Sequence, residues 1–176
     1  MVPAPASDPT EIAVEFGPVG EALDAFNKVV HVWLAGTEIK ANRLAAGIVA
    51  VIPSPDHVSA YRTLQEYLPC VKIDAEHSRD LSYMINRPKP SRSLGPETEL
   101  NRLTRWGVLW IQVFVSTAPT STGVQLPGAG GLYVSVDCDN STPAEREGLL
   151  DNAKLVDTYD ELMEMALQNL EHGELA

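Results

Sequence analysis

The sequence lacks any long hydrophobic run, since no apolar stretch reaches the roughly 18–20 residues that a membrane-spanning helix requires. Its first ten residues, MVPAPASDPT, contain neither the basic nor the apolar part of a secretory signal peptide, and we expect them to form a flexible leader. Only two cysteines occur among 176 residues, which excludes a disulfide-rich scaffold. The hydrophobic content of 44% nevertheless indicates a folded core, in a single domain.

Both cysteines, Cys70 and Cys138, lie in segments that have the character of a strand. Free cysteines are often buried in such elements, so both are interpreted as structural thiols. One disulfide, or a metal-binding role, is the alternative.

Basic residues are scarce near the C-terminus. Residues 137–176 carry eleven acidic and two basic side chains, a balance of −9, while the whole chain has a net charge of −11. Residues 1–136 are therefore close to neutral. Binding to nucleic acid through bulk charge requires clustered cations, and we do not expect it here.

Alternation of apolar with polar residues, which is typical of half-buried strands, dominates the first 140 residues. In TEIAVEF, for example, Ile12, Val14 and Phe16 alternate with Glu11, Ala13 and Glu15. A loop with a short helical turn is predicted between the first two strands. The predicted strands are residues 10–16, 29–36, 46–53, 70–76, 80–86, 107–115 and 132–139.

The strand at 107–115 is apolar on both faces. Leu109 and Ile111 belong to one face, and Val108 and Trp110 belong to the other. A strand that is apolar on both sides is typical of the centre of a fold or of a partner interface. Trp110 is accordingly predicted to be buried.

Two segments have the 3.6-residue period of a helix. The first begins at Ser54 as cap and Pro55 as first residue, and it ends at Pro69. The second covers residues 157–171 and ends at Gly173. Just before it, Thr142, Pro143 and Glu145 form the capping-box pattern of another helix start.

The connection formed by residues 87–105 contains three prolines and several cations, and it is predicted to be a long loop. Its cations are candidates for contact with a partner, or with the acidic C-terminal region of the same or a neighbouring chain. The apolar face of the last helix also needs a surface to cover it. The interface candidates are Arg87, Lys89, Arg92, Arg102, Arg105, Leu162, Met165 and Leu170.

No pattern in the sequence indicates catalysis or a cofactor. The polar segment DAEHSRD at 74–80 is interpreted as a turn, and no nucleophile has the context of a known catalytic motif. Asp137 and Asp139 share one side of a strand end and are weak candidates for calcium, but DCDN lacks the other ligands of an EF-hand. We therefore expect no enzymatic activity, no cofactor and no firm metal site.

The number of strands, with one inserted helix, favours a mainly β protein built as an antiparallel sandwich. The order AGIVAVIPSP, a short helix, VKIDAEHSRDLSYMINRP, a long loop and then WGVLWIQVFVSTAPTS resembles a viral jelly roll. The resemblance covers about residues 29–140 and is to the coat proteins of small icosahedral positive-strand RNA viruses, of picorna-like and tymo-like type. It implies a jelly-roll sandwich at 11–140. The helical period and the charge of residues 141–176 predict an acidic helical extension, which is not a usual feature of those coat proteins.

The function that this resemblance implies is structural. The chain would be a capsid subunit that assembles with copies of itself, with or without sister coat proteins, into an icosahedral shell around RNA. It would be found in the virion, and in the host cytoplasm during assembly. The basic N-terminal arm of many such proteins is missing, so contact with RNA is expected to be weak or indirect. The alternatives are a monomeric acidic binding or immunity-type protein that engages a basic partner, and a small cupin-like enzyme.

Overall fold

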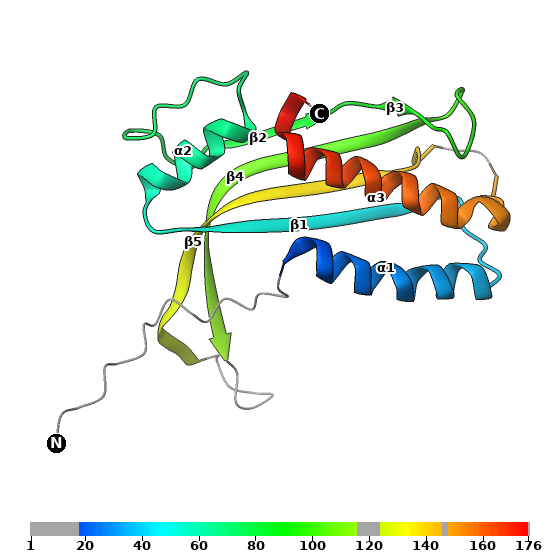
Figure 1. Cartoon of the computed structure of the whole chain (residues 1–176), viewed down its shortest axis with the longest axis horizontal. Coiled ribbons are helices and arrows are strands. Elements are labelled where there is room, and N and C mark those ends of the chain that lie inside the picture. The colour runs from blue at the N-terminus through cyan, green and yellow to red at the C-terminus, as the bar shows by residue number, and fades with distance from the viewer. Residues whose placement is uncertain (1–17, 116–123, 146–147, 176) are drawn as a thin grey trace.

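The computed structural model describes residues 18–115, 124–145 and 148–175, which form one antiparallel sheet with helices packed on one face (Figure 1). The strands lie in the order β1-β5-β4-β2, and β3 pairs separately with β4. The strands are β1 (Ala45–Ser54), β2 (Ser82–Asn86), β3 (Lys89–Pro90), β4 (Glu99–Val115) and β5 (Val124–Ser141). The helices are α1 (Val19–Gly36), α2 (His57–Tyr67) and α3 (Leu155–His172), with short 3-10 turns at Asn152–Lys154 and Gly173–Leu175.

Strict alternation along the strands separates a helix-covered face of the sheet from an open face. Val136 of β5 pairs across the sheet with Trp106 of β4 and with Ala50 of β1, and all three belong to the covered face. The next residue, Asp137, belongs to the open face. The sequence predicts this alternation for residues 132–139, and the burial of Leu132, Val134, Val136 and Cys138 confirms its inward half. The outward half holds only for Asp137 and Asp139, because Tyr133 and Ser135 are also buried.

Helix α3 supplies much of the core on the covered face. Leu162, Met165 and Ala166 are buried at the spacing that places them on one side of the helix. The helix ends at Gly173, whose φ of 70° is the left-handed conformation that glycine adopts most easily. The predicted helix at 157–171 and its glycine stop are both confirmed.

The prediction of antiparallel β structure is confirmed, but the fold is mixed α/β and not mainly β. The strands predicted at 46–53 and 80–86 correspond to β1 and β2. Within the described parts of the chain, helices and not a second sheet pack against the covered face. The strand predicted at 10–16 lies outside the described residues.

The strand predicted at 29–36 is wrong, because this segment is the second half of helix α1. Its run of Val and Trp residues has a strand-like composition. The helix nevertheless places Leu23, Val30 and Leu34 on one side, where they pack against the core. Tertiary packing therefore overrides the local preference of the β-branched residues.

The strand predicted at 70–76 is also wrong, because a side chain meets the backbone hydrogen-bonding demand of this segment. The Nε2 of Gln65 donates to the carbonyl oxygens of Leu68 (2.8 Å) and Val71 (2.6 Å). The Oε1 of Gln65 accepts from the amide of Ile73 at 2.8 Å. Cys70 is consequently exposed in a turn and not buried in a strand.

The predicted loop at 87–105 is shorter than expected, because β4 begins at Glu99. Arg102 and Arg105 are therefore strand residues. β4 does lie between β5 and β2, as expected for a central strand. Trp110, however, is 62% exposed, since it lies beyond the helices that cover the sheet, whereas Trp106 is only 1% exposed.

The inserted helix is confirmed as α2, although its cap differs from the prediction. Asp56, and not Ser54, caps the helix, and its carboxylate accepts from the Ser59 amide at 2.8 Å. The helix start predicted at Thr142 is wrong. The hydroxyl of Thr142 instead accepts from the Leu44 amide at 3.0 Å, which extends the pairing of β1 with β5.

We expect Trp106→Ala to lower the free energy of unfolding by about 3–5 kcal/mol, because it leaves a cavity under the helices. Trp110→Ala is the matched control and should cost less than about 1 kcal/mol, since its side chain is mostly in solvent. Urea unfolding followed by circular dichroism measures both values. Equal costs would contradict the assignment of the covered face.

Candidate interaction surface

The outward side of α1 exposes a patch of large apolar side chains. Val29, Val32 and Trp33, called the α1 patch below, are 69%, 75% and 55% exposed. Hydrogen bonds fix the rotation of the helix: the hydroxyl of Tyr159 donates to Asn27 Oδ1 at 2.6 Å, and His31 Nε2 lies 2.6 Å from Asp160 Oδ1. The patch is therefore held outward by contacts on the opposite side of the same helix.

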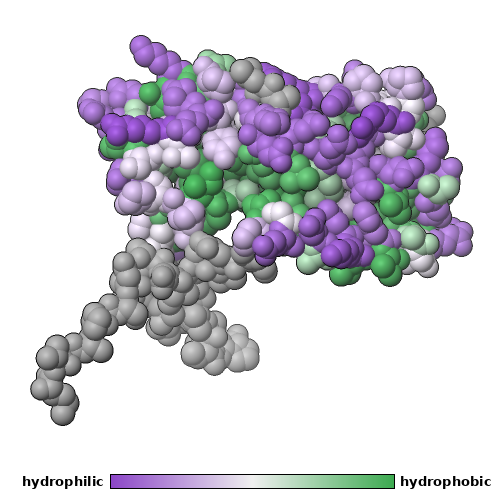
Figure 2. Space-filling model, in the orientation of Figure 1, coloured by the Kyte–Doolittle hydropathy of each residue, from purple (hydrophilic) through white to green (hydrophobic). Residues whose placement is uncertain are grey.

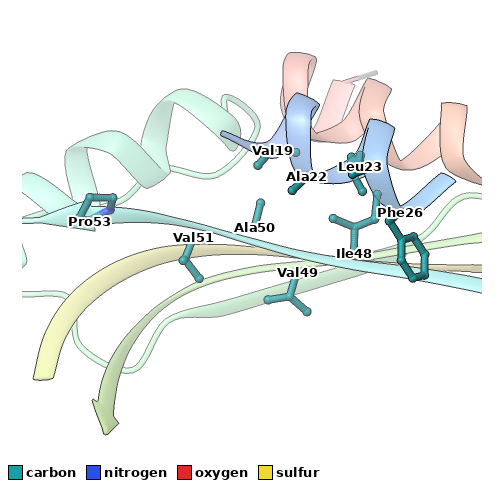
Figure 3. Close-up of a pocket in the computed structure, with 10 residues that line it drawn as sticks. Val19, Ala22, Leu23, Phe26, Ile48, Val49, Ala50, Val51 and Pro53 are labelled. Atoms are coloured by element: carbon teal, nitrogen blue, oxygen red, sulfur yellow. The ribbon is translucent and has the colours of Figure 1, made fainter. Parts of the chain in front are cut away.

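A second apolar feature is a trough between the first turns of α1 and the edge of β1 (Figure 3). It has a volume of about 650 Å³. Ile48 and Ala50 point toward the helix, while Val49 and Val51 point to the other side of the strand. Figure 2 shows hydrophobic side chains gathered around a hollow beside these turns. The helix side of the trough is formed by Val19, Ala22, Leu23, Ala25 and Phe26.

The open face of the sheet has a mixed character. Arg105 and Asp137 form an ion pair across neighbouring strands, with 3.1 Å between Nη1 and Oδ2. Exposed apolar side chains lie on either side of this ion pair on the same face, Val49 next to Asp137 and Met84 next to Arg105. An exposed ion pair of this kind contributes little to stability, about 0–1 kcal/mol, but it gives the face a polar centre.

The calcium candidates Asp137 and Asp139 do lie on one side of β5, on the open face. Asp137 is already paired with the Arg105 guanidinium, which neutralises much of its attraction for a cation. In the portion of the chain that the structure describes, no three His, Cys, Asp or Glu side chains are arranged to hold a metal ion.

The interface cations bind the acidic C-terminal region of their own chain. Arg87 forms an ion pair with Glu174, and it also donates to the backbone carbonyl of Glu174 at 2.5 Å. Arg92 forms ion pairs with Glu161 and Glu164. The expected pairing of this region with nearby cations is therefore confirmed within one chain.

The remaining interface candidates have other roles. The Arg102 guanidinium is buried and donates to Asn169 of α3. Lys89 is exposed in β3. Leu162 and Met165 are buried and Leu170 is half-buried, all packed in the core of the same chain. The apolar face of α3 is therefore covered by its own sheet and is not open to a partner.

Glu161 is a buried acidic residue that accepts several hydrogen bonds. Burial raises the pKa of its carboxyl group, but hydrogen bonds from the Arg92 and Ser93 amides and from the Ser91 and Ser93 hydroxyls outweigh burial, so the net shift is downward. The Arg92 amide donates to Oε1 at 2.7 Å, and the Ser93 amide donates to Oε2 at 3.0 Å. This carboxylate ties the loop after β3 to α3.

The two thiols differ in environment. Cys138 is fully buried on the covered face, and burial raises the pKa of its thiol to about 11. Cys70 is exposed. The two are free and unpaired, so the prediction of a structural thiol is confirmed for Cys138 and is wrong for Cys70.

Neither the models of known protein families nor the curated proteins compared with this sequence give a match. None of the described helices combines the length and apolarity that crossing a bilayer demands. The sequence pattern predicts a strand at 29–36 and therefore does not predict the α1 patch. Phe26, Val29 and Trp33, spaced three and four residues apart, are the helical signal that could have revealed it.

Glu161→Gln is expected to destabilise the protein by about 1–3 kcal/mol at pH 7, because it removes a charged acceptor of several hydrogen bonds. The folded-state pKa is lowered, so this contribution is fully present above the ordinary glutamate pKa of about 4.3 and disappears as pH falls through the folded-state value. The free energies of unfolding of the wild-type protein and of Glu161→Gln should therefore approach each other as pH falls. Measuring both from pH 7 down to pH 3 tests this. The exposed Glu164→Gln variant is the control, with an expected cost under about 1 kcal/mol.

Native protein should react with a thiol reagent at Cys70 alone at neutral pH. The Cys138 thiol is buried and protonated, whereas reaction requires an accessible thiolate. Labelling followed by peptide mass analysis should find Cys138 modified only after unfolding. Equal labelling of both cysteines in the folded state would contradict the placement of Cys138 under α3.

Proposed function

We propose that this chain is a structural protein, without enzymatic activity, that assembles with copies of itself. The observation that carries the proposal is the α1 patch, with three large apolar side chains held outward on one helix. Monomeric proteins rarely expose contiguous apolar surface of this kind, and such patches are characteristic of interaction sites. The commonest assembly is a twofold dimer, in which the same patch of both subunits meets itself.

The energetics of the patch suit the centre of an interface. Burial of a Val or Trp side chain contributes about 1.5–3 kcal/mol, so three residues contribute several kcal/mol. Association costs a similar amount in lost freedom of motion, and a stable interface needs about 800 Å² from each partner. The polar surface around α1 would form the rim of that interface.

A copy of the same chain is favoured over other partners. The net charge of −11 opposes binding to nucleic acid or to anionic membranes. A basic protein partner would use the acidic C-terminal region, but three of its eleven acidic side chains, Glu161, Glu164 and Glu174, are already paired with arginines of their own chain. The apolar patch needs no complementary charge from its partner.

The narrower form of the proposal is a coat-protein subunit of a small RNA virus, with a jelly-roll fold and a place in the virion. It rests on the resemblance of residues 29–140. The helical layer on the covered face departs from the two packed sheets of a jelly roll, so self-association is the primary statement. Particles seen by negative-stain microscopy of the purified protein, alone or with sister coat proteins, would support this form.

Val32→Glu should weaken self-association at least about tenfold, which corresponds to about 1.4 kcal/mol, because it places a charge in an apolar contact. Sedimentation velocity over a range of concentrations measures the effect. Leu149→Glu is the matched control: it adds the same charge at an exposed leucine outside the patch and should change association little.

The effect of salt on self-association distinguishes an apolar interface from one that is formed by ion pairs. Chains with a charge of −11 repel one another, and salt screens that repulsion, with a Debye length of about 10 Å at 0.1 M and about 3 Å at 1 M. Apolar association should therefore strengthen as salt is raised. A wild-type chain that stays monomeric throughout, or equal effects of Val32→Glu and Leu149→Glu, would overturn the proposal.

A further inference from the structure

Strand β1 forms a free edge of the sheet, since β5 is its only neighbour among the described strands. The amide of Thr142 donates to the Leu44 carbonyl at 2.9 Å, so the backbone of Leu44 faces β5. Alternation along the regular register then directs the backbone groups of Gly47, Val49 and Val51 to the free side. Pro53 belongs to the same set, and a proline without an N–H is tolerated at an edge of this kind.

This free edge opens into the apolar trough under α1. The N-terminal half of α1 lines the trough together with Ile48–Pro53 of β1, while its C-terminal half lies beside Leu44–Gly47. The helix is thus antiparallel to the strand and displaced beyond the edge of the sheet (Figure 1). A free sheet edge that lies next to the apolar side of a helix has the shape and the hydrogen-bonding groups that one added strand requires.

The segment directly before α1 matches this shape. Residues 11–16, EIAVEF, have the strict alternation of a half-buried strand and end just before Pro18 and Val19, where the trough begins. Six residues of strand span about 20 Å, the same length as Ile48–Pro53. With Ile12, Val14 and Phe16 turned toward α1, both glutamates would lie on the open face.

We propose that residues 11–16 of the same chain occupy the trough as a strand added to the free edge of β1. Val19 lies over Ala50, at the end of α1 nearer to Pro53 (Figure 3), so a strand that ends beside Val19 must run parallel to β1. Residues 11–54 then form a β-α-β unit with α1 as its crossover, the connection that parallel neighbours require. A two-residue link between strand and helix is an ordinary length for such a unit.

Disulfide trapping tests the position and the face of the added strand. In a Cys70→Ser background, Val14→Cys and Ala50→Cys would both face α1 and should form an intrachain disulfide under mild oxidation. Ala13→Cys with Ala50→Cys is the matched control, because a shift of one residue turns the side chain to the opposite face. We expect the first pair to cross-link at least about tenfold faster, as read by mass analysis of unreduced peptides.

Hydrogen exchange provides a second measurement on the full chain. The amides of Val49 and Val51 should be protected, and Val14→Asp should reduce that protection at least about tenfold, while Ala13→Asp should not. Equal cross-linking of both pairs, or unprotected Val49 and Val51 amides, would overturn the proposal. Disulfides found only between chains would also overturn it, in favour of the same segment from a second copy. None of these outcomes depends on self-association through the α1 patch.

Discussion

The packing of α3 across the covered face of the sheet is the contact on which the other elements depend. Leu162 and Ala166 are completely buried against strand residues such as Val134 and Val136. Polar contacts fix the position of the helix along the sheet, since the Asn140 side chain donates to the Leu162 carbonyl at 2.9 Å. Apolar burial provides most of the stabilisation, and these hydrogen bonds determine the register.

Two other parts of the chain are held in place by α3. The Glu161 carboxylate accepts hydrogen bonds from the loop after β3, and Arg87 holds Glu174 just beyond the end of the helix. On the other side, Tyr159 and Asp160 contact Asn27 and His31 of α1. Since α1 rests against α3 and lies beyond the edge strand β1, its apolar outer side has no cover from the described residues.

The strands could be predicted where one face of the sheet is buried. The alternation of β1, β2 and β5 follows from the covered and open faces, and the amphipathic period of α3 follows from its single buried side. The α1 patch could not be predicted in this way. Val29, Val32 and Trp33 are apolar but exposed, so their composition indicated a buried strand where the chain forms a half-exposed helix.

The sequence pattern also could not predict where β4 begins, or which of its tryptophans is buried. Trp106 and Trp110 lie four residues apart on the same side of the strand, but the predicted strand at 107–115 contains only Trp110, which is the tryptophan predicted to be buried. What separates them is tertiary packing: Trp106 is 1% exposed and lies near Asn169 of α3, whereas Trp110 is 62% exposed. The segment at 70–76 could not be predicted either. The Gln65 side chain makes hydrogen bonds to its backbone in place of a neighbouring strand, and such a contact has no periodic pattern in the sequence.

The two edges of the sheet place different demands on the chain. β2 has only five residues, and a short edge offers little to a foreign strand. β1 has ten residues, AAGIVAVIPS, none of them charged, and an edge of this kind promotes aggregation unless it is covered. Its free backbone groups can be satisfied by any added strand, including one from its own chain. The α1 patch has no backbone groups to pair and needs the side chains of another protein surface, so the two features call for two different contacts.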